Sequence, residues 1–376
     1  MAPTVESCWE AFTNGTSNII LLHYNLTGRL KNRRPRKENF DAMTMLFIAV
    51  SCLIVLENLV VLLAILKNMR FRRWVYYCII NITLSDLLTG TAYLINICLS
   101  GNFTFQLSLD VWFLREGVLF IALAASIFSL LITAIERYTT MIRPSPESEA
   151  NKTIRVYALI GCFWLLASII GLLPMLGWNC TCDFKNCSTL LPLYSKRYIL
   201  FSVIMFSAIL IGIIGFYVAI YLLVQRTSNR TPSASHHRKK SLKLLKTVLM
   251  ILGAFIICWS PLFALLMMDV FCPSLICESL QGMEWILTLA VVNSAINPII
   301  YSFRSLEVRK AIFSFLCHCC IRKGIHGPCD CLVIPDITSG SSTESSLRTR
   351  DSFRKSRALS VLSREPLTSI SSVPST

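Results

Sequence analysis

Residues 43–66 read MTMLFIAVSCLIVLENLVVLLAIL, and Glu57 is the one charged residue in this stretch. A helix that crosses about 30 Å of hydrocarbon needs roughly 20 mostly apolar residues, because its backbone polar groups have no water to bind and must pair within the segment. The stretch is long enough and apolar enough to meet that requirement. It therefore predicts a transmembrane helix.

Six further stretches of the same kind follow it along the chain. They cover residues 74–99, 112–142, 155–177, 196–224, 243–271 and 284–303. Apolar residues make up 54% of the 376 residues and charged residues only 15%, against about 25% charged residues in soluble domains. The sequence therefore excludes a water-soluble fold and predicts an all-α membrane protein with a seven-transmembrane helix bundle over residues 43–303.

Basic residues are distributed unevenly between the two sides of this predicted bundle. The loops after the first, third and fifth stretches, together with the carboxy-terminal tail, hold 26 of the 36 Lys and Arg residues. Cytoplasmic loops carry such an excess, so we expect residues 1–42 to be extracellular, with glycosylation at Asn14 and Asn25. Six basic residues between positions 29 and 37 argue the other way. The basic residues form no continuous stripe, so the net charge of +15 does not indicate a nucleic-acid partner.

Ionisable side chains inside the predicted helices are few, and they are costly enough in hydrocarbon to indicate function. Arg115 and Glu116 are adjacent at the outer end of the third helix. They project about 100° apart, so they cannot both face lipid at low cost. Either they bind a ligand that carries an anion and a cation close together, or they pair with each other or extend to the lipid headgroups.

Marker residues in a fixed order on successive helices give the chain its first resemblance. The markers are Asn58, Asp86, the run Glu136-Arg137-Tyr138, Trp164, FIICWSP at residues 255–261 and NPIIY at residues 297–301. In this order they resemble the rhodopsin-like G-protein-coupled receptors, although the proline common in the fifth helix of that family is missing. The resemblance implies a G-protein switch at the inner end of the bundle, formed by Glu136, Arg137, Tyr217, Asn297, Pro298 and Tyr301. Pro261 lacks a backbone N–H and predicts a hinge in the sixth helix.

Longer stretches narrow the resemblance to one group of these receptors. They are WFLREG at residues 112–117, residues 85–96, the loop at residues 177–194 and residues 293–298. They resemble the sphingosine 1-phosphate receptors, which implies a plasma-membrane receptor that binds this lysophospholipid and activates inhibitory and twelve/thirteen-class G proteins. A receptor for another lysophospholipid, such as lysophosphatidate, is the alternative, although the related lysophosphatidate receptors carry glutamine at the position of Glu116.

Two other classes of membrane protein are less favoured. A transporter usually shows repeat symmetry with paired broken helices, and no internal repeat is visible. An enzyme would need a nucleophile and a base that converge, and the predicted helices contain no histidine. We therefore expect a receptor and no enzymatic activity.

The resemblance also implies a position for each part of the ligand. The phosphate would be held by Tyr24, Arg29 and Arg115, and the ammonium by Glu116 and Asn96, with Glu284 adding negative charge nearby. Arg29 stands where the family has lysine, a mild change because a guanidinium group binds phosphate at two points. The lipid chain would lie among Phe120, Leu123, Trp259, Leu262, Phe263, Leu266 and Leu287. Residues 1–42 would cap this pocket.

Asp86 is the carboxylate nearest the middle of the second predicted helix. It is expected to hold a sodium ion together with Ser126, close to Asn293, Ser294 and Asn297. The alternative is a hydrated polar network that packs the helices without an ion. No other cofactor is expected.

Cysteines gather in two of the outer loops. No cysteine lies near the outer end of the third predicted helix, where most rhodopsin-like receptors anchor a disulfide. The resemblance implies instead that each loop is closed on itself, with Cys180 bonded to Cys187 and Cys272 bonded to Cys277. Cys182 is an extra cysteine in the first of these loops. Disulfides of this kind form in an oxidising compartment.

Residues 304–320 combine a basic amphipathic stretch with juxtamembrane cysteines. We expect a short eighth helix there and palmitoylation of Cys317, Cys319 and Cys320. Zinc binding is the alternative, but the spacing fits no standard zinc finger. Residues 321–376 are predicted to form a disordered cytoplasmic tail that receptor kinases and arrestins would recognise.

Overall fold

The computed structural model describes residues 18–26, 42–68, 74–142, 149–183, 186–230, 235–271 and 283–316. These residues all belong to one compact unit, Met1–Leu316. Some expected site residues, and the tail at residues 321–376, lie outside the described residues. The site residues concerned are Asn14, Arg29, Cys272, Cys277, Cys317, Cys319 and Cys320.

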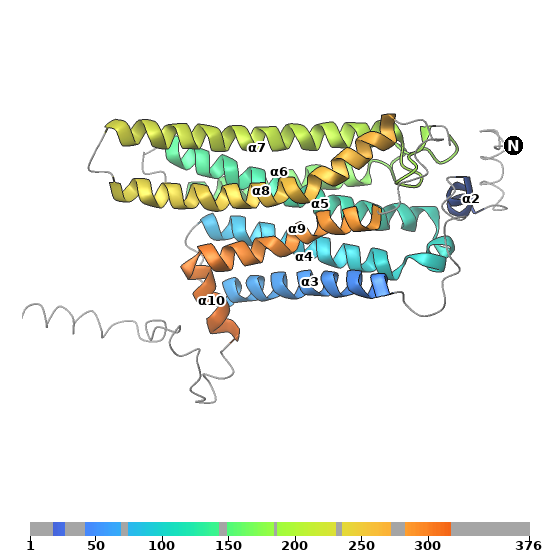
Figure 1. Ribbon diagram of the computed structural model, residues 1–376, viewed down its shortest axis with the longest axis horizontal. Coiled ribbons are helices and arrows are strands. Elements are labelled where there is room, and N and C mark those ends of the chain that lie inside the picture. The colour runs from blue at the N-terminus through green and yellow to red at the C-terminus, as the bar shows by residue number, and fades with distance from the viewer. Residues whose placement is uncertain are drawn as a thin grey trace, which may run out of the picture. The chain divides into compact units, whose positions relative to one another are not determined.

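Long helices make up most of the described structure (Figure 1). They are α2 (Ile19–Leu26), α3 (Ala42–Asn68), α4 (Trp74–Cys98), the 3₁₀ helix η1 (Gly101–Gln106), α5 (Leu109–Ile142), α6 (Glu149–Leu172), α7 (Lys196–Arg230), α8 (Ser235–Phe271), α9 (Met283–Arg304) and α10 (Leu306–Leu316). Helices α3 to α8 are long and apolar enough to cross a membrane. Helix α9 has 22 residues, which gives about 33 Å at the rise of an α-helix. The predicted seven-helix bundle, with α10 as a short eighth helix, is confirmed.

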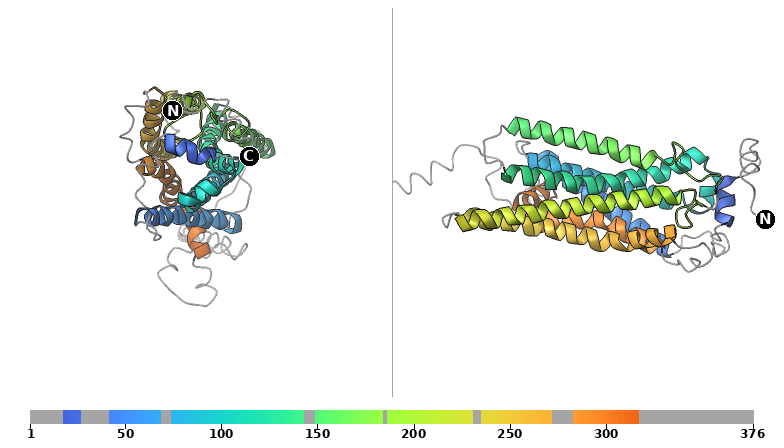
Figure 2. Two further views of the ribbon diagram at one scale, coloured as in Figure 1. Left: turned by 90° about the vertical axis from the view of Figure 1, so that its right-hand side faces the viewer. Right: turned by 90° about the horizontal axis from the view of Figure 1, so that it is seen from above.

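Helix α5 lies at the centre of the bundle. It packs against α4, α6 and α7, and α9 closes the bundle by contacting α3, α4 and α8. The stretch from Ala122 to Leu130 is buried at every position, so the middle of α5 has no lipid-facing side. Figure 2 shows α2 lying across one end of the bundle, and we call this the outer end.

Large apolar side chains cover the outside of the bundle. Leu165, Ile211 and Ile257 are 64%, 69% and 69% exposed, and many other Leu and Ile side chains on α3, α6, α7 and α8 are similarly exposed. Soluble proteins rarely expose contiguous apolar patches of this extent. This surface is suited to lipid hydrocarbon, as expected for a multi-pass membrane protein.

Some helix ends differ from those predicted. Helix α6 ends at Leu172 instead of residue 177, because Pro174 follows and the residue before a proline is disfavoured in the helical conformation. Helix α2 has no counterpart among the predicted helices, since its eight residues are far too few to give a transmembrane pattern. Helices α7 and α8 extend beyond the apolar stretches, to Arg230 and from Ser235.

Two glycines allow α5 and α6 to approach closely. A Cβ atom at Gly171 would lie 2.5 Å from the Cγ1 atom of Ile121 and 2.9 Å from the backbone oxygen of Gly117. A Cβ atom at Gly117 would lie 2.9 Å from the backbone oxygen of Gly171. Small residues at such crossings let membrane helices pack backbone to backbone. The contact fixes the position of α5 at Gly117, the residue that follows Glu116.

We expect Gly171→Ala to destabilise the bundle, because the added methyl group must push the two helices apart. Overpacking of this kind costs about 1–3 kcal/mol, which should lower the melting temperature of the detergent-purified protein. Gly161→Ala is the matched control. Gly161 lies on the same helix, and a Cβ atom there would meet nothing within 4 Å. Equal melting temperatures for the two variants would contradict the close packing.

Candidate functional site

Arg115 and Glu116 form an ion pair with each other at the outer end of α5. Atom Nη2 of Arg115 lies 2.5 Å from Oε1 of Glu116, and the two side chains are 6% and 19% exposed. Atom Nη1 of Arg115 also donates hydrogen bonds to the backbone oxygen of Leu99 at 3.0 Å and to Thr104 Oγ1 at 3.4 Å. Of the two interpretations left open by the sequence, mutual pairing is the arrangement in this structure.

Asn96 lies beside this ion pair. Its Nδ2 atom donates to the backbone oxygen of Arg115 at 3.5 Å. The structure therefore brings three of the expected head-group residues together, from α4 and α5. Glu284 is exposed at the start of α9.

Helix α2 contacts the loop that precedes α5. Asn18 Nδ2 donates to the backbone oxygen of Phe105 at 2.5 Å. The Tyr24 ring meets the Phe105 ring edge to face, with ring centroids 5.4 Å apart. These contacts place Tyr24 at the outer end of the bundle, while Asn25 on the same helix is exposed. The described part of the amino-terminal segment therefore covers the end of the bundle that carries Arg115.

The loop between α6 and α7 contains a disulfide between Cys180 and Cys187, the pair implied by the family resemblance. Cys182 is also disulfide-bonded. His23 of α2 lies close to the sulfur atoms of Cys180 and Cys187. Because those sulfurs are bonded to each other, this cluster is not a metal site.

Tyr194 ends this loop inside a group of aromatic side chains. It stacks on Phe120, with ring centroids 5.4 Å apart, and also contacts Trp112, Phe113 and Tyr198. Burial, followed by the negative charge of Glu116, raises the pKa of the Tyr194 hydroxyl well above its usual range. This side chain is therefore a neutral phenol close to the Arg115–Glu116 pair.

The residues expected to contact the lipid chain all belong to one apolar cluster in the bundle. Leu123, Trp259, Leu262 and Leu266 are buried members, and Phe120, Phe263 and Leu287 pack against them. The Trp259 ring lies between those of Phe255 and Phe263, with centroid distances of 5.2 Å and 5.6 Å. The structure thus brings these residues together below Arg115 and Glu116, in a region that also forms the core of the bundle.

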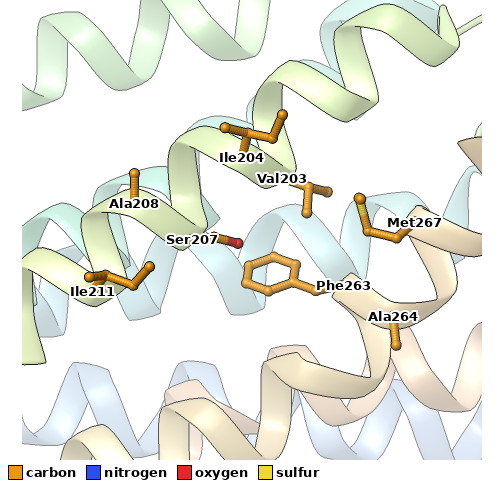
Figure 3. A pocket seen from close by; sticks show the side chains of 8 residues that line it. All are labelled: Val203, Ile204, Ser207, Ala208, Ile211, Phe263, Ala264 and Met267. Atoms are coloured by element: carbon orange, nitrogen blue, oxygen red, sulfur yellow. The ribbon is translucent and has the colours of Figure 1, made fainter.

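A groove of about 450 Å³ lies between α7 and α8 (Figure 3). Its lining is apolar except for Ser207. Phe263 is the one residue it shares with the expected lipid-chain set, and it points across the groove toward α7. Ile204 and Ile211 on its α7 side are exposed on the outside of the bundle. The groove therefore lies on the side of the bundle that faces the membrane.

Asp86 is fully buried and joins three helices. Its carboxylate accepts hydrogen bonds from Ser126 at 3.2 Å, Ser294 at 2.9 Å and Asn297 at 2.8 Å. The hydroxyl oxygens and carboxylate oxygens of this group are ligands that suit a hard cation. The sodium ion expected at Asp86 and Ser126 stays a prediction, which a titration of the purified protein with NaCl would test.

Glu136, at the inner end of α5, has an ionic partner that the sequence did not indicate. The sequence places Arg137 beside Glu136, and a charge pair between them that a G protein could break stays a prediction. In addition, Arg155 of α6 donates two hydrogen bonds to the Glu136 carboxylate, both at 2.8 Å. A guanidinium group reaches both carboxylate oxygens only from a suitable angle, and α6 provides it. Arg137 lies within electrostatic range of Cys78 and of Tyr217 on α7.

Comparison with known proteins agrees with this arrangement. Residues 57–301 match the 7 transmembrane receptor (rhodopsin family). Sphingosine 1-phosphate receptor 4 of Homo sapiens is 59% identical over 374 residues, covering 98% of this chain and 97% of the relative. The chain belongs to the sphingosine 1-phosphate receptor family.

Other members of the receptor family are also similar. Sphingosine 1-phosphate receptor 4 of Mus musculus is 57% identical over 99% of this chain and 97% of its own length. Sphingosine 1-phosphate receptor 1 of Danio rerio is 46% identical over 81% of this chain and 86% of its own length. Residues 72–83 and the tail at residues 351–354 and 364–372 look most like the fourth subtype, and the higher identity to receptor 4 than to receptor 1 agrees with this interpretation.

Sequence reasoning missed three contacts of this receptor. In the sequence, Arg155 is one of the basic residues that mark the cytoplasmic side, Asp269 is a charge near the end of the sixth predicted helix, and His23 is the residue before Tyr24. For Arg155 and Asp269, the available signal was a charged residue close to the end of an apolar stretch. Such a residue needs a partner, but the sequence does not show which residue that partner is.

We expect Arg155→Gln to destabilise the receptor, because Glu136 is 0% exposed and loses the cation bound to both of its oxygens. Leaving a buried acceptor poorly satisfied costs about 1–3 kcal/mol, measured as a lower melting temperature in detergent. Arg155→Lys keeps the charge without the two-point geometry, so it should fall between wild type and Arg155→Gln. A wild-type melting temperature for Arg155→Gln would show that the pair does not stabilise the fold.

Proposed function

We propose that this chain is a cell-surface receptor for sphingosine 1-phosphate that activates heterotrimeric G proteins. The observation that carries the proposal is the buried pair of opposite charges formed by Arg115 and Glu116 at the outer end of α5. The lipid carries the same two charges, a phosphate and an ammonium, close together. The membership of the chain in the sphingosine 1-phosphate receptor family supports the same ligand.

The ligand would bind by an exchange of ionic partners. Its phosphate takes the place of Glu116 on Arg115, and its ammonium takes the place of Arg115 on Glu116. Neither protein charge is left without a partner in the bound state, which matters because an unpaired charge in a partly dry site is costly. Asn96, beside the pair, adds a hydrogen-bonding group for the ammonium end.

The phosphate would receive further contacts from the amino-terminal cap. Tyr24 lies on α2 against Phe105, and Arg29 follows three residues after the end of that helix. A guanidinium group binds phosphate at two points, so Arg29 suits the role that lysine has elsewhere in the family. Glu284 adds negative charge near the ammonium.

The lipid chain would extend from the ion pair into the apolar cluster around Trp259. Phe120 is one helical turn below Glu116, and Leu123 lies one turn deeper on the same helix. Leu262, Phe263 and Leu266 of α8 and Leu287 of α9 belong to the same cluster. An alkyl chain there is removed from water, which stabilises it by roughly 0.8 kcal/mol per methylene group.

The excess of Lys and Arg in one set of loops supports an extracellular amino terminus in the plasma membrane. Exposed Asn25, together with Asn14, would then be available for glycosylation, and Cys317, Cys319 and Cys320 for palmitoylation on the inner side. Inhibitory and twelve/thirteen-class G proteins, receptor kinases and arrestins are the cytoplasmic partners that the family resemblance favours.

We expect Glu116→Gln to weaken binding of sphingosine 1-phosphate by roughly 2–4 kcal/mol, the scale of breaking a desolvated charge pair. The glutamine keeps the shape of the side chain but cannot balance the ammonium. Lysophosphatidate has no ammonium, so its response should improve in the same variant. Competition binding and nucleotide exchange with both lipids, at matched surface expression, measure the effect.

Arg115→Ala is the companion variant, because both lipids carry the phosphate. It should abolish the response to each of them. If Glu116→Gln keeps the wild-type preference for the amine-bearing lipid, Glu116 is not the ammonium partner. A wild-type chain that answers lysophosphatidate and not sphingosine 1-phosphate would instead favour the alternative ligand.

We expect Arg137→Ala to keep ligand binding and lose nucleotide exchange on the G protein. The inner half of α8 can swing outward about Pro261, which interrupts that helix, and Arg137 would then face the inserted partner. Binding of labelled sphingosine 1-phosphate and exchange of guanine nucleotide are measured on the same membranes. Loss of both would mean that Arg137 has only a structural role.

A further inference from the structure

Asp269 is a buried carboxylate that has no part in the proposed ligand contacts. It is 1% exposed and lies two residues before the end of α8. Its oxygens accept hydrogen bonds from the hydroxyl groups of Ser188 and Thr189, and the backbone N–H of Thr189 donates to it at 3.0 Å. Three donors from one loop therefore converge on a single side chain of the sixth transmembrane helix.

The location of Asp269 is unfavourable for the helix itself. The last turn of an α-helix carries partial negative charge, so a carboxylate there is repelled, whereas hydrogen bonds to a charged acceptor are stronger than those between neutral groups. Helix α8 has no basic residue in its last turn to offset this charge. The contact with the loop is thus the feature that stabilises Asp269 in this position.

Ser188 links this contact to the shape of the loop. Its hydroxyl donates to Asp269 and accepts hydrogen bonds from the backbone N–H groups of Leu190 at 3.1 Å and Leu191 at 2.8 Å. These three bonds use the full capacity of a hydroxyl group. The backbone N–H of Ser188 also donates to the oxygen of Tyr194 at 2.9 Å, which closes the segment at residues 188–194 on itself.

The same segment reaches the pocket and the cap. Tyr194 stacks on Phe120, one of the residues proposed to contact the lipid chain. The backbone N–H of Leu193 points to His23 Nε2 of α2 at 3.5 Å, and Leu193 has a φ of 63°, a conformation that is uncommon for a bulky residue. A defined loop shape is therefore needed to hold Tyr194 and Leu193 where they are.

We propose that Asp269 is a positioning residue that joins residues 188–194 to the outer end of α8, so that the loop, Tyr194 and the sixth helix move as one unit and retain the bound lipid. The inference rests on the proposed function for its ligand. Releasing the loop from α8 frees Tyr194 from Phe120 and opens a route out of the pocket. Ligand dissociation then becomes faster without any change in the residues that bind the head group.

The test uses the full-length receptor with Asp269→Ala, Ser188→Ala and the double variant. Hydrogen–deuterium exchange of residues 188–194 in the ligand-free protein measures the freedom of the loop, and release of radiolabelled sphingosine 1-phosphate measures retention. We expect faster exchange and about tenfold faster release in Ser188→Ala, the scale of one hydrogen bond to a charged group. The effect should be larger in Asp269→Ala, which removes all three bonds to the loop. The effect of the double variant should be smaller than the sum of the two single effects, because both remove the bond between Ser188 and Asp269.

Asp183→Ala is the matched control. Asp183 is an exposed acidic residue of the same loop and accepts a hydrogen bond from Asn186 at 2.6 Å, so its removal changes the loop charge without touching α8. It should leave release unchanged. Asp269→Asn keeps an acceptor for the Thr189 N–H and should partly restore retention, which a general loss of folding would not show.

Two outcomes overturn the inference. One is wild-type release in Asp269→Ala at normal surface expression, and the other is equal acceleration by Asp183→Ala. Failure of the wild-type chain to bind sphingosine 1-phosphate would contradict the proposed function instead. The exchange measurement needs no ligand, so slow exchange of residues 188–194 in Asp269→Ala would still refute the attachment of the loop.

Discussion

Hydrocarbon offers no hydrogen-bond partner, so a polar side chain within the bundle is stabilised when another part of the protein binds it. The result is that the polar groups tie the helices together. Asn58 donates to the backbone of α9 at Ser294, and Trp164 of α6 donates to Asn81 of α4, which in turn donates to Ser129 of α5. With Asp86, these contacts connect most helices of the bundle through a few buried groups.

The central helix carries both ends of the proposed signalling path. Glu116 and Glu136 are 20 residues apart on α5, which places them about 30 Å apart along the helix. Each has an arginine partner, but Arg115 is on the same helix and Arg155 is on α6. A ligand that changes the outer pair therefore does not reach the inner pair by charge, and the response has to pass through the packing of neighbouring helices. Helix α8 packs against α7 and α9 and has a proline inside it, so it is suited to move in response.

The fold could be predicted because the thickness of the membrane sets the length of an apolar stretch, and seven such stretches are visible in the chain. Helix α2 could not, since eight residues carry too little periodicity. The residues of the site were identified from motifs, and so were the neighbours of Asp86, but the partners of Glu136 and Asp269 were not. Glu136 and Arg155 are 19 residues apart in sequence, and Thr189 and Asp269 are 80 apart. Such pairs depend on which faces the helices turn toward each other, and an apolar pattern that is nearly uniform around α3 or α6 does not fix those faces.

The ion pair between Arg115 and Glu116 determines how strongly lipid binding should depend on ionic strength. Dissolved ions weaken attraction between charges that water surrounds, over a distance of about 8 Å at physiological ionic strength. Arg115 is only 6% exposed, so few ions can come between it and an anionic group bound there. The choice between lipids at this pair is therefore expected to change little with the salt concentration of the medium.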